Sequence, residues 1–254
     1  NTAVIPQLVD FLIDRGVAGL FSGGSTGEGH TLTDAEYEAV MREACEATAG
    51  RVPFVAGLIV NSTRDAILRT RRLEGLDIVA LQVTPVYYLF KPDADATVEH
   101  FRAIWEETGK PIIIYNVLAA APVPPATMRK IAALPGVIGT KESAGSSLAW
   151  LSELVETAPD SFAVTWATDH MLFPGFALGA VGSISGFTSL FPRESIIMFD
   201  AVQRNDYDAA RRIHYALNPL MRVIMTGPNW PGRMKVVFNL LGRNAGPCRA
   251  PFTA

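Results

Sequence analysis

The chain has 254 residues, a formal net charge of −3, 49% apolar residues and 19% charged residues. This length suits a single large α/β domain, which folds around its core without a disulfide or metal staple. The composition excludes a disordered protein, and the lack of a basic excess disfavours nucleic-acid binding. Cys45 and Cys248 lie outside any CxxC pair. With no leader pattern and no apolar run of membrane-spanning length, they indicate a reduced, cytoplasmic protein that binds no membrane.

Short apolar runs rich in β-branched residues alternate with longer amphipathic segments along the chain. Runs of this length, bounded by Gly, Pro or polar residues, are typical of strands buried on both faces of a parallel sheet. We expect seven strands, at Val17–Ser22, Val52–Ile59, Ile78–Thr84, Pro111–Val117, Val137–Lys141, Phe162–Ala167 and Ala180–Ser185.

The segments between these runs carry helix start and stop signals. Thr33-Asp34-Ala35-Glu36 is a capping box, and Gly50 follows the helix that it opens. We expect helices at Ile5–Asp14, at Thr33 to about Ala49, at Arg64–Glu74, Ala94–Thr108 and Thr127–Leu134, and near 147–158, 170–178, 193–204, 206–224 and 233–241.

Strands and helices in strict alternation predict right-handed βαβ units. Seven such units, with one strand expected before the opening helix, predict a (β/α)8 TIM barrel whose first strand is missing from the sequence. An open, doubly wound sheet of seven strands is the alternative. We expect residues 1–191 to form the barrel domain and residues 192–254 to form a C-terminal helical extension packed on it.

Two reactive side chains lie where predicted strands end, which is where barrel enzymes place their active sites. Of the five lysines, Lys141 is the one that ends an apolar strand. Partial removal from water there favours a neutral amine that can attack a ketone and form an imine; a lysine that reaches solvent or pairs with Glu142 is the alternative. Tyr115 ends the preceding strand, where its phenol can transfer protons or be a core tyrosine.

The first predicted strand leads into Gly23-Gly24-Ser25-Thr26-Gly27-Glu28-Gly29. Such a loop exposes successive backbone N–H groups suited to a carboxylate or phosphate, and Ser25 and Thr26 add hydroxyl donors. The loop also matches the G-x-S-x-G pattern of serine hydrolases. That interpretation is disfavoured because no helix starts directly after Ser25.

The histidines are isolated and show no metal-binding spacing. We therefore expect no metal and no cofactor, which disfavours a metal-dependent aldolase. The stretch Thr84–Thr97, which contains Tyr87, Tyr88 and Phe90, forms a long loop. Loops of this length are often functional or pack against a neighbouring subunit.

Five motifs occur in one order along the chain. They are Gly24-Ser25-Thr26-Gly27-Glu28, Thr84-Pro85-x-Tyr87-Tyr88, Tyr115-Asn116-Val117, Gly139-Thr140-Lys141-Glu142 and Gly182-Ser183-Ile184-Ser185. Together they resemble the dihydrodipicolinate synthase / N-acetylneuraminate lyase family of class I aldolases, with a similarity that runs from about Leu8 to Pro251. The resemblance implies a (β/α)8 barrel and a homotetramer built as a dimer of dimers.

The resemblance also implies roles for individual residues. Lys141 corresponds to the lysine that forms a Schiff base with pyruvate, and Tyr115 to the tyrosine that relays protons. Ser25 and Thr26 correspond to the pair that binds the pyruvate carboxylate, with Ser25 also part of the relay.

Three further positions are implied in the same way. Tyr88, or alternatively Tyr87, corresponds to a tyrosine donated across a dimer interface to the neighbouring site. Ile184 matches a position whose backbone faces the bound pyruvate. Asp169 lies where relatives contact the distal part of the substrate.

The family chemistry implies a lyase that joins or cleaves pyruvate, or a related 2-oxo acid, and an aldehyde. The reactions that the resemblance implies also include those of hydratase-aldolases and dehydratases. Synthases of the family carry an Arg five residues after the relay tyrosine, and Ala120 stands there in this chain. An apolar loop cannot bind a carboxylate as a guanidinium does, so we expect a less charged second substrate. True 4-hydroxy-tetrahydrodipicolinate synthase activity and a non-catalytic 2-oxo-acid-binding homologue are the alternatives.

Overall fold

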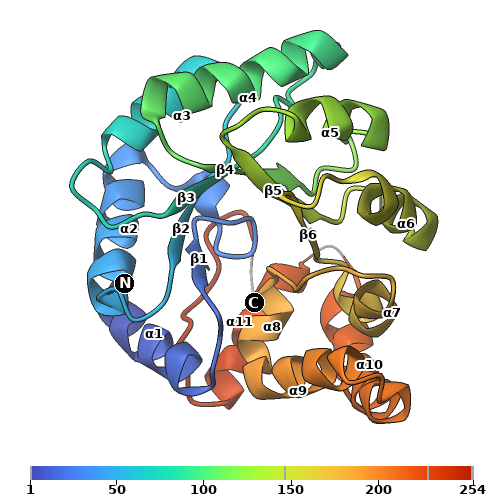
Figure 1. The fold of residues 1–254 in the computed structure, drawn as a ribbon. Coiled ribbons are helices and arrows are strands. Elements are labelled where there is room, and N and C mark those ends of the chain that lie inside the picture. Colours follow the sequence, from blue (N-terminus) through green and yellow to red (C-terminus); the bar gives the residue numbers. More distant parts are fainter. Residues whose placement is uncertain (1, 146, 228, 253–254) are drawn as a thin grey trace.

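The structure, a computed structural model, describes residues 2–145, 147–227 and 229–252. Its described residues form one six-stranded parallel sheet with strands in sequence order. The strands are β1 (Leu20–Ser22), β2 (Phe54–Leu58), β3 (Ala80–Val83), β4 (Ile112–Asn116), β5 (Val137–Glu142) and β6 (Ala163–Trp166). The sheet is curled and surrounded by helices (Figure 1).

The helices occur largely where the sequence predicts them. They are α1 (Ile5–Asp14), α2 (Asp34–Thr48), α3 (Thr63–Arg71), α4 (Ala94–Thr108), α5 (Pro125–Ala132), α6 (Leu148–Thr157), α7 (Leu172–Ala177), α8 (Gly186–Leu190), α9 (Pro192–Gln203), α10 (Tyr207–Met225) and α11 (Trp230–Leu240). Single turns of 3-10 helix cover Thr2–Val4, Gly29–Thr31 and Asp169–Met171. The short helix α8 was not predicted.

Side-chain caps explain where several of these helices begin. The predicted capping box is present: Thr33 accepts from the Glu36 backbone, and the Glu36 side chain accepts from the Thr33 backbone. Ser62 caps α3, and Asp93 caps α4. Each cap satisfies a backbone donor that the first turn leaves without a partner.

The prediction of a seventh strand at Ala180–Ser185 is wrong, because these residues do not form a regular strand. Val181 N donates to Val164 O and Trp166 N donates to Gly182 O, each at 3.0 Å. After these two bonds the chain turns away, since Ser185 caps α8 by accepting from the Phe187 backbone. In the described residues the sheet therefore has six parallel strands and is curled and open, and closure into a full (β/α)8 barrel stays a prediction.

The main core lies between the outer face of the sheet and the helices. Its most deeply buried members include Leu58, Leu81, Ile112, Ile114 and Trp166. A second, smaller apolar cluster joins α8, α10 and α11 through Phe187, Leu190, Met221, Ile224 and Met234. In the described part of the chain, no helix has the length and apolar character needed to cross a membrane.

Candidate active site

The glycine-rich loop of residues 23–29 follows β1 and packs tightly against the neighbouring strands. A Cβ atom on Gly24 would lie 2.5 Å from the Phe21 ring and 3.0 Å from the Tyr115 hydroxyl. A Cβ atom on Gly29 would overlap the backbone of Gly23. Only glycine fits at these two positions, and this close packing brings the backbone of Ser25 to the end of β4.

Ser25, Tyr115 and Lys141 come together at this edge of the sheet. The Ser25 N–H donates to the Tyr115 hydroxyl at 3.0 Å, and Ser25 Oγ lies 3.3 Å from the same oxygen. Tyr115 and Lys141 are register partners in β4 and β5, so their side chains share one face of the sheet. Lys141 Nζ lies 4.6 Å from the centre of the Tyr115 ring and 5.6 Å from that of Phe21.

This surrounding changes the acidity of the phenol. Burial by itself raises the pKa of Tyr115, but the positive charge of Lys141 and the hydrogen bonds with Ser25 outweigh burial and lower it. Both side chains are largely removed from water, with Lys141 9% and Tyr115 2% exposed. A phenol that releases its proton more readily beside a buried amine is suited to proton transfer.

Asp169 lies close enough to Lys141 for the Lys141 charge to act on its carboxyl. Ser185 donates a hydrogen bond to Asp169 Oδ1, and Ser185 Oγ accepts from Phe187 N at 3.0 Å. Burial raises the pKa of the Asp169 carboxyl to about 6, although the Ser185 hydrogen bond and the Lys141 charge oppose that rise. Asp169 is therefore a second group with an altered proton affinity at the same end of the sheet.

Thr26 and Ile184 lie on segments that meet across the open side of the sheet. A Cβ atom on Gly186 would stand 2.7 Å from Thr26 Cγ2, so the Thr26 side chain packs directly on the start of α8. Ile184 is half-buried two residues before this contact. Thr26 and the 184–186 segment therefore lie together.

The predicted interface tyrosines lie on the loop of residues 84–93 between β3 and α4. Tyr87 is half-buried and lines a cavity of about 670 Å³ with His30 and Asn61. Tyr88 is 73% exposed, and its backbone N–H donates to Asn61 Oδ1 at 3.1 Å. The Tyr88 side chain is thus on the surface of the described chain, apart from the group of Ser25, Tyr115 and Lys141. Ala120 is exposed in the loop that follows β4.

A second polar pair occupies the next register position, where Asn116 of β4 lies beside Glu142 of β5. Asn116 Nδ2 donates to Glu142 Oε2 at 2.6 Å and to Val123 O at 3.0 Å, and Val123 N donates to Asn116 Oδ1 at 2.9 Å. Gly145 N donates to Glu142 Oε1 at 3.2 Å. Burial raises the pKa of Glu142 to about 7 against these hydrogen bonds.

Sequence reasoning missed Phe21 and Ser185 as parts of this site. Phe21 packs edge to face against Tyr115, with ring centroids 5.7 Å apart. The sequence contained a usable indication of this, because successive side chains of a strand point to opposite faces. Phe21 follows Leu20 and so faces the inside of the curled sheet. Ser185 belongs to the motif Gly182-Ser183-Ile184-Ser185, but its hydrogen bond to Asp169 depends on how the chain turns after Gly182. Among the described residues, no group of three or more His, Cys, Asp or Glu side chains could hold a metal ion.

Comparisons with known proteins agree with this geometry. The model of the dihydrodipicolinate synthetase family matches residues 1–254. The 4-hydroxy-tetrahydrodipicolinate synthase of Listeria innocua is 36% identical over 97% of this chain and 84% of its own length. The dihydrodipicolinate synthase of Aquifex aeolicus superposes with a TM-score of 0.93 at 32% identity, over 100% of this chain and 86% of that chain.

A third similar protein is the chloride-inhibited dihydrodipicolinate synthase of Acinetobacter baumannii, solved in complex with pyruvate. It has a TM-score of 0.91 and is 26% identical, over 100% of this chain and 87% of that chain. These findings confirm the family and the enzyme class that the five motifs predict. The chain belongs to the dihydrodipicolinate synthetase family and is a lyase of that family.

Proposed function

We propose that this chain uses Lys141 to form a Schiff base with pyruvate or a closely related 2-oxo acid. One observation carries the proposal: the buried Lys141 amine lies over the Tyr115 ring, while the Tyr115 hydroxyl is hydrogen-bonded to the loop of Ser25. The amine, a proton carrier and a carboxylate-binding loop are then positioned together before substrate arrives.

The mechanism follows from these positions. Neutral Lys141 Nζ attacks the C2 ketone, and the proton released by the nitrogen passes to the oxygen, which gives a neutral carbinolamine. Tyr115 then protonates the carbinolamine hydroxyl, which leaves as water. The resulting protonated imine withdraws electrons from C3, and the Tyr115 phenolate recovers its proton from C3 to give an enamine. The enamine carbon attacks an aldehyde in the synthetic direction, and retro-aldol cleavage regenerates the enamine in the other. The N–H groups and hydroxyls of Ser25 and Thr26 hold the carboxylate throughout.

We propose an uncharged or weakly charged second substrate. Residues 117–124, which connect β4 to α5, contain no charged side chain, so this loop offers no cation for a carboxylate. Asp169, whose carboxyl senses the charge of Lys141, and its hydrogen-bond partner Ser185 can bind hydroxyls of a distal group. Lyase, aldolase, hydratase-aldolase and dehydratase reactions all fit this site. True 4-hydroxy-tetrahydrodipicolinate synthase activity is the second candidate, because similar curated proteins carry that name.

Two aldehydes of equal chain length distinguish these candidates. Butanal carries no charge, whereas succinic semialdehyde ends in a carboxylate. We expect pyruvate consumption with butanal to exceed that with succinic semialdehyde. Equal or greater turnover of the carboxylate-bearing aldehyde would contradict the proposed substrate class and favour the synthase.

Borohydride reduction in the presence of pyruvate tests the Schiff base. We expect a reduced pyruvyl adduct on Lys141, absent in Lys141→Ala and retained in the matched control Lys130→Ala, whose amine pairs with Asp95 on the surface. Pyruvate binding without an adduct would point to a non-catalytic binding protein. Labelling of Ser25 by a fluorophosphonate would instead favour a serine hydrolase.

We also propose that the six strands belong to a (β/α)8 barrel, with residues 1–191 as its domain and 192–254 as the helical extension. The curl of the sheet and the two backbone bonds between β6 and the 181–182 segment support this (Figure 1). The small core formed with α10 and α11 supports an extension packed on the barrel. A cytoplasmic location remains part of the proposal.

The chain is proposed to assemble as a homotetramer, a dimer of dimers, with Tyr88 at an interface. Tyr88, Leu89 and Phe90 are 73%, 73% and 81% exposed, a run of large apolar side chains that a contact between copies would cover. Sedimentation velocity tests this. A monomer at micromolar concentration would contradict it, and Tyr88→Asp weakens the assembly if the proposal holds.

A further inference from the structure

Glu28 closes the glycine-rich loop, and its side chain is held by groups from the far end of the chain. Its backbone takes the left-handed conformation with φ of 58°, and its carboxylate is buried, with the residue 6% exposed. Lys235 Nζ donates to Glu28 Oε2 at 2.6 Å, and Arg249 N donates to Glu28 Oε1 at 2.7 Å. Both oxygens of one buried carboxylate are therefore used by α11 and the segment that follows it.

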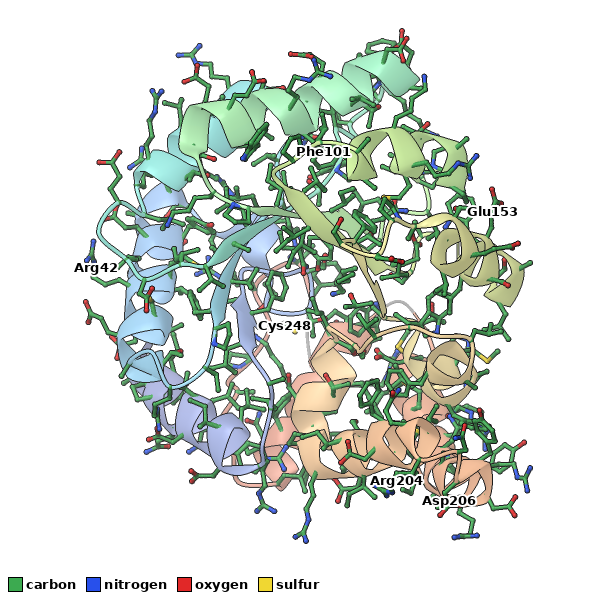
Figure 2. The ribbon with its side chains drawn as sticks, viewed as in Figure 1. Arg42, Phe101, Glu153, Arg204, Asp206 and Cys248 are labelled. Carbon is green, nitrogen blue, oxygen red and sulfur yellow. The ribbon has the colours of Figure 1, made fainter. Side chains whose placement is uncertain are left out.

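The donors are themselves fixed. Lys235 Nζ also donates to Pro247 O at 2.8 Å, which ties α11 to the C-terminal segment of residues 243–252. The Arg249 guanidinium binds both oxygens of Glu36, at 2.6 and 3.2 Å, in the capping box of α2. Cys248 of this segment lies inside the ring of helices next to the loop (Figure 2).

We call the contacts of the Glu28 carboxylate with Lys235 and Arg249 the clamp. The backbone of Glu28 connects the clamp to the candidate active site. Glu28 N donates to Ser25 O at 3.0 Å, and the N–H of Ser25 donates to the Tyr115 hydroxyl. A movement of Glu28 therefore displaces the Ser25–Thr26 peptide, which joins the two residues proposed to bind the carboxylate. Burial raises the pKa of the Glu28 carboxyl, but the hydrogen bonds and charges of Lys235 and Arg249 outweigh burial and lower it.

We propose that Glu28 is a positioning residue for substrate binding, and that Lys235 and the C-terminal segment hold it in place. The inference rests on the proposed function, in which Ser25 and Thr26 bind the carboxylate of a 2-oxo acid. The last residues of the chain thereby help to set the affinity for pyruvate, although they lie outside the sheet that carries Lys141.

Three variants test the clamp. Glu28→Gln keeps the size and an acceptor for Arg249 N but removes the charge, and Lys235→Met removes the amine; the third variant combines them. We expect each single variant to raise the pyruvate concentration for half-maximal borohydride trapping by about tenfold or more, because small displacements of binding groups are costly. The maximal trapping rate stays within about twofold, and the double variant resembles the more affected single one.

Asp10→Asn is the matched control, because the Arg51–Asp10 ion pair has the same 2.6 Å length and lies between α1 and the end of α2. A second readout is hydrogen–deuterium exchange of the peptide covering residues 23–30 in the ligand-free protein. Exchange there should be faster in Glu28→Gln and Lys235→Met than in wild type or the control. A purely structural role would lower the thermal midpoint and leave both readouts unchanged, which would overturn the proposal.

Failure of the two proposals can be told apart. If the wild-type protein forms no pyruvyl adduct, the proposed function fails, and the exchange of the 23–30 peptide alone decides whether Glu28 positions the loop. If the adduct forms but neither half-saturation nor exchange responds to Glu28→Gln, the positioning role is wrong while the Schiff-base proposal stands.

Discussion

Two polar pairs stand one residue apart on β4 and β5 and have different surroundings. Tyr115 and Lys141 face the inside of the curled sheet, where the amine lies against aromatic rings. Asn116 and Glu142 face the helices, are 0% exposed, and are satisfied by hydrogen bonds to each other and to the loops that follow. The inner face of these two strands therefore carries the proposed catalytic pair, and the outer face carries a pair whose hydrogen bonds hold the loops that follow.

The largest effect is expected from Tyr115→Phe, which removes the proposed proton carrier and keeps the ring. The maximal rate of pyruvyl adduct formation should fall about 10²-fold or more. Because the phenol oxygen is one acceptor of the Ser25 N–H, the free energy of unfolding should fall by only about 1 kcal/mol. Rapid-quench borohydride trapping and urea unfolding measure the two quantities, and an unchanged rate would remove Tyr115 from the mechanism.

Glu142→Ala should have the opposite effects, with a large loss in the free energy of unfolding and little change in the maximal rate. It leaves Gly145 N and part of the Asn116 amide without their buried acceptor, so unfolding should become easier by about 3 kcal/mol. The maximal rate of the folded enzyme should change by no more than about threefold. Glu153→Ala is the control, because its pair with Arg129 lies on the surface and should contribute less than about 1 kcal/mol. A rate loss as large as that of Tyr115→Phe would break the comparison.

The pH dependence of stability sharpens the comparison, because a second buried group opposes Glu142. His100 Nε2 donates to Thr84 O at 3.2 Å and Nδ1 accepts from Thr63 at 2.9 Å, while burial lowers its pKa to about 4. The contribution of His100 to the free energy of unfolding is therefore lost as the pH falls from 6.5 towards 4. The pKa of Glu142 is raised from 4.5 to about 7, so its contribution to the free energy of unfolding is lost as the pH rises from 4.5 to about 7. Each contributes about 3 kcal/mol over its full range.

Single substitutions should reveal the opposite effects of His100 and Glu142 on how the free energy of unfolding changes with pH between 4.5 and 6.5. Relative to wild type, the free energy of unfolding of His100→Gln should fall as the pH rises, and that of Glu142→Gln should rise. Urea unfolding at several pH values measures both. The account is contradicted if the two variants follow the same pH dependence.

The smallest effect is expected for Asp169→Asn. Ionisation of Asp169 near pH 6 places a negative charge beside Lys141 and the bound anion. Wild-type half-saturation by pyruvate should therefore rise by about threefold more than that of Asp169→Asn between pH 5 and 7. The variant keeps an oxygen that accepts from Ser185. Identical pH profiles for the two proteins would show that Asp169 lies too far from the anion to matter.

The sequence predicted best what depends on local chemistry. The boundaries of α4 and the start of α2 agree with the structure, because Thr33, Asp93 and Gly109 act within one turn of their helices. The strand Val17–Ser22 was predicted too long, since only Leu20–Ser22 pairs with β2 and an apolar run does not reveal where pairing begins.

The missed features depend on long-range packing. The segment 180–185 has the composition of a strand, but only two backbone bonds to β6 were formed before Ser185 turned the chain into α8. Likewise, Glu28 was visible in a motif, whereas its partners Lys235 and Arg249 are brought to it only by the path of the C-terminal segment. The convergence of Ser25, Tyr115 and Lys141 was predictable because strand ends of a parallel sheet meet at one edge.

A crystal structure of the protein soaked in pyruvate tests the central claim most directly. The account predicts continuous density from Lys141 Nζ to C2 of pyruvate, with the carboxylate on the N–H groups and hydroxyls of Ser25 and Thr26. Asn116 and Glu142 should keep their hydrogen bonds unchanged. Pyruvate bound away from the inner face, or bound there beside a free Lys141 amine, would contradict the account.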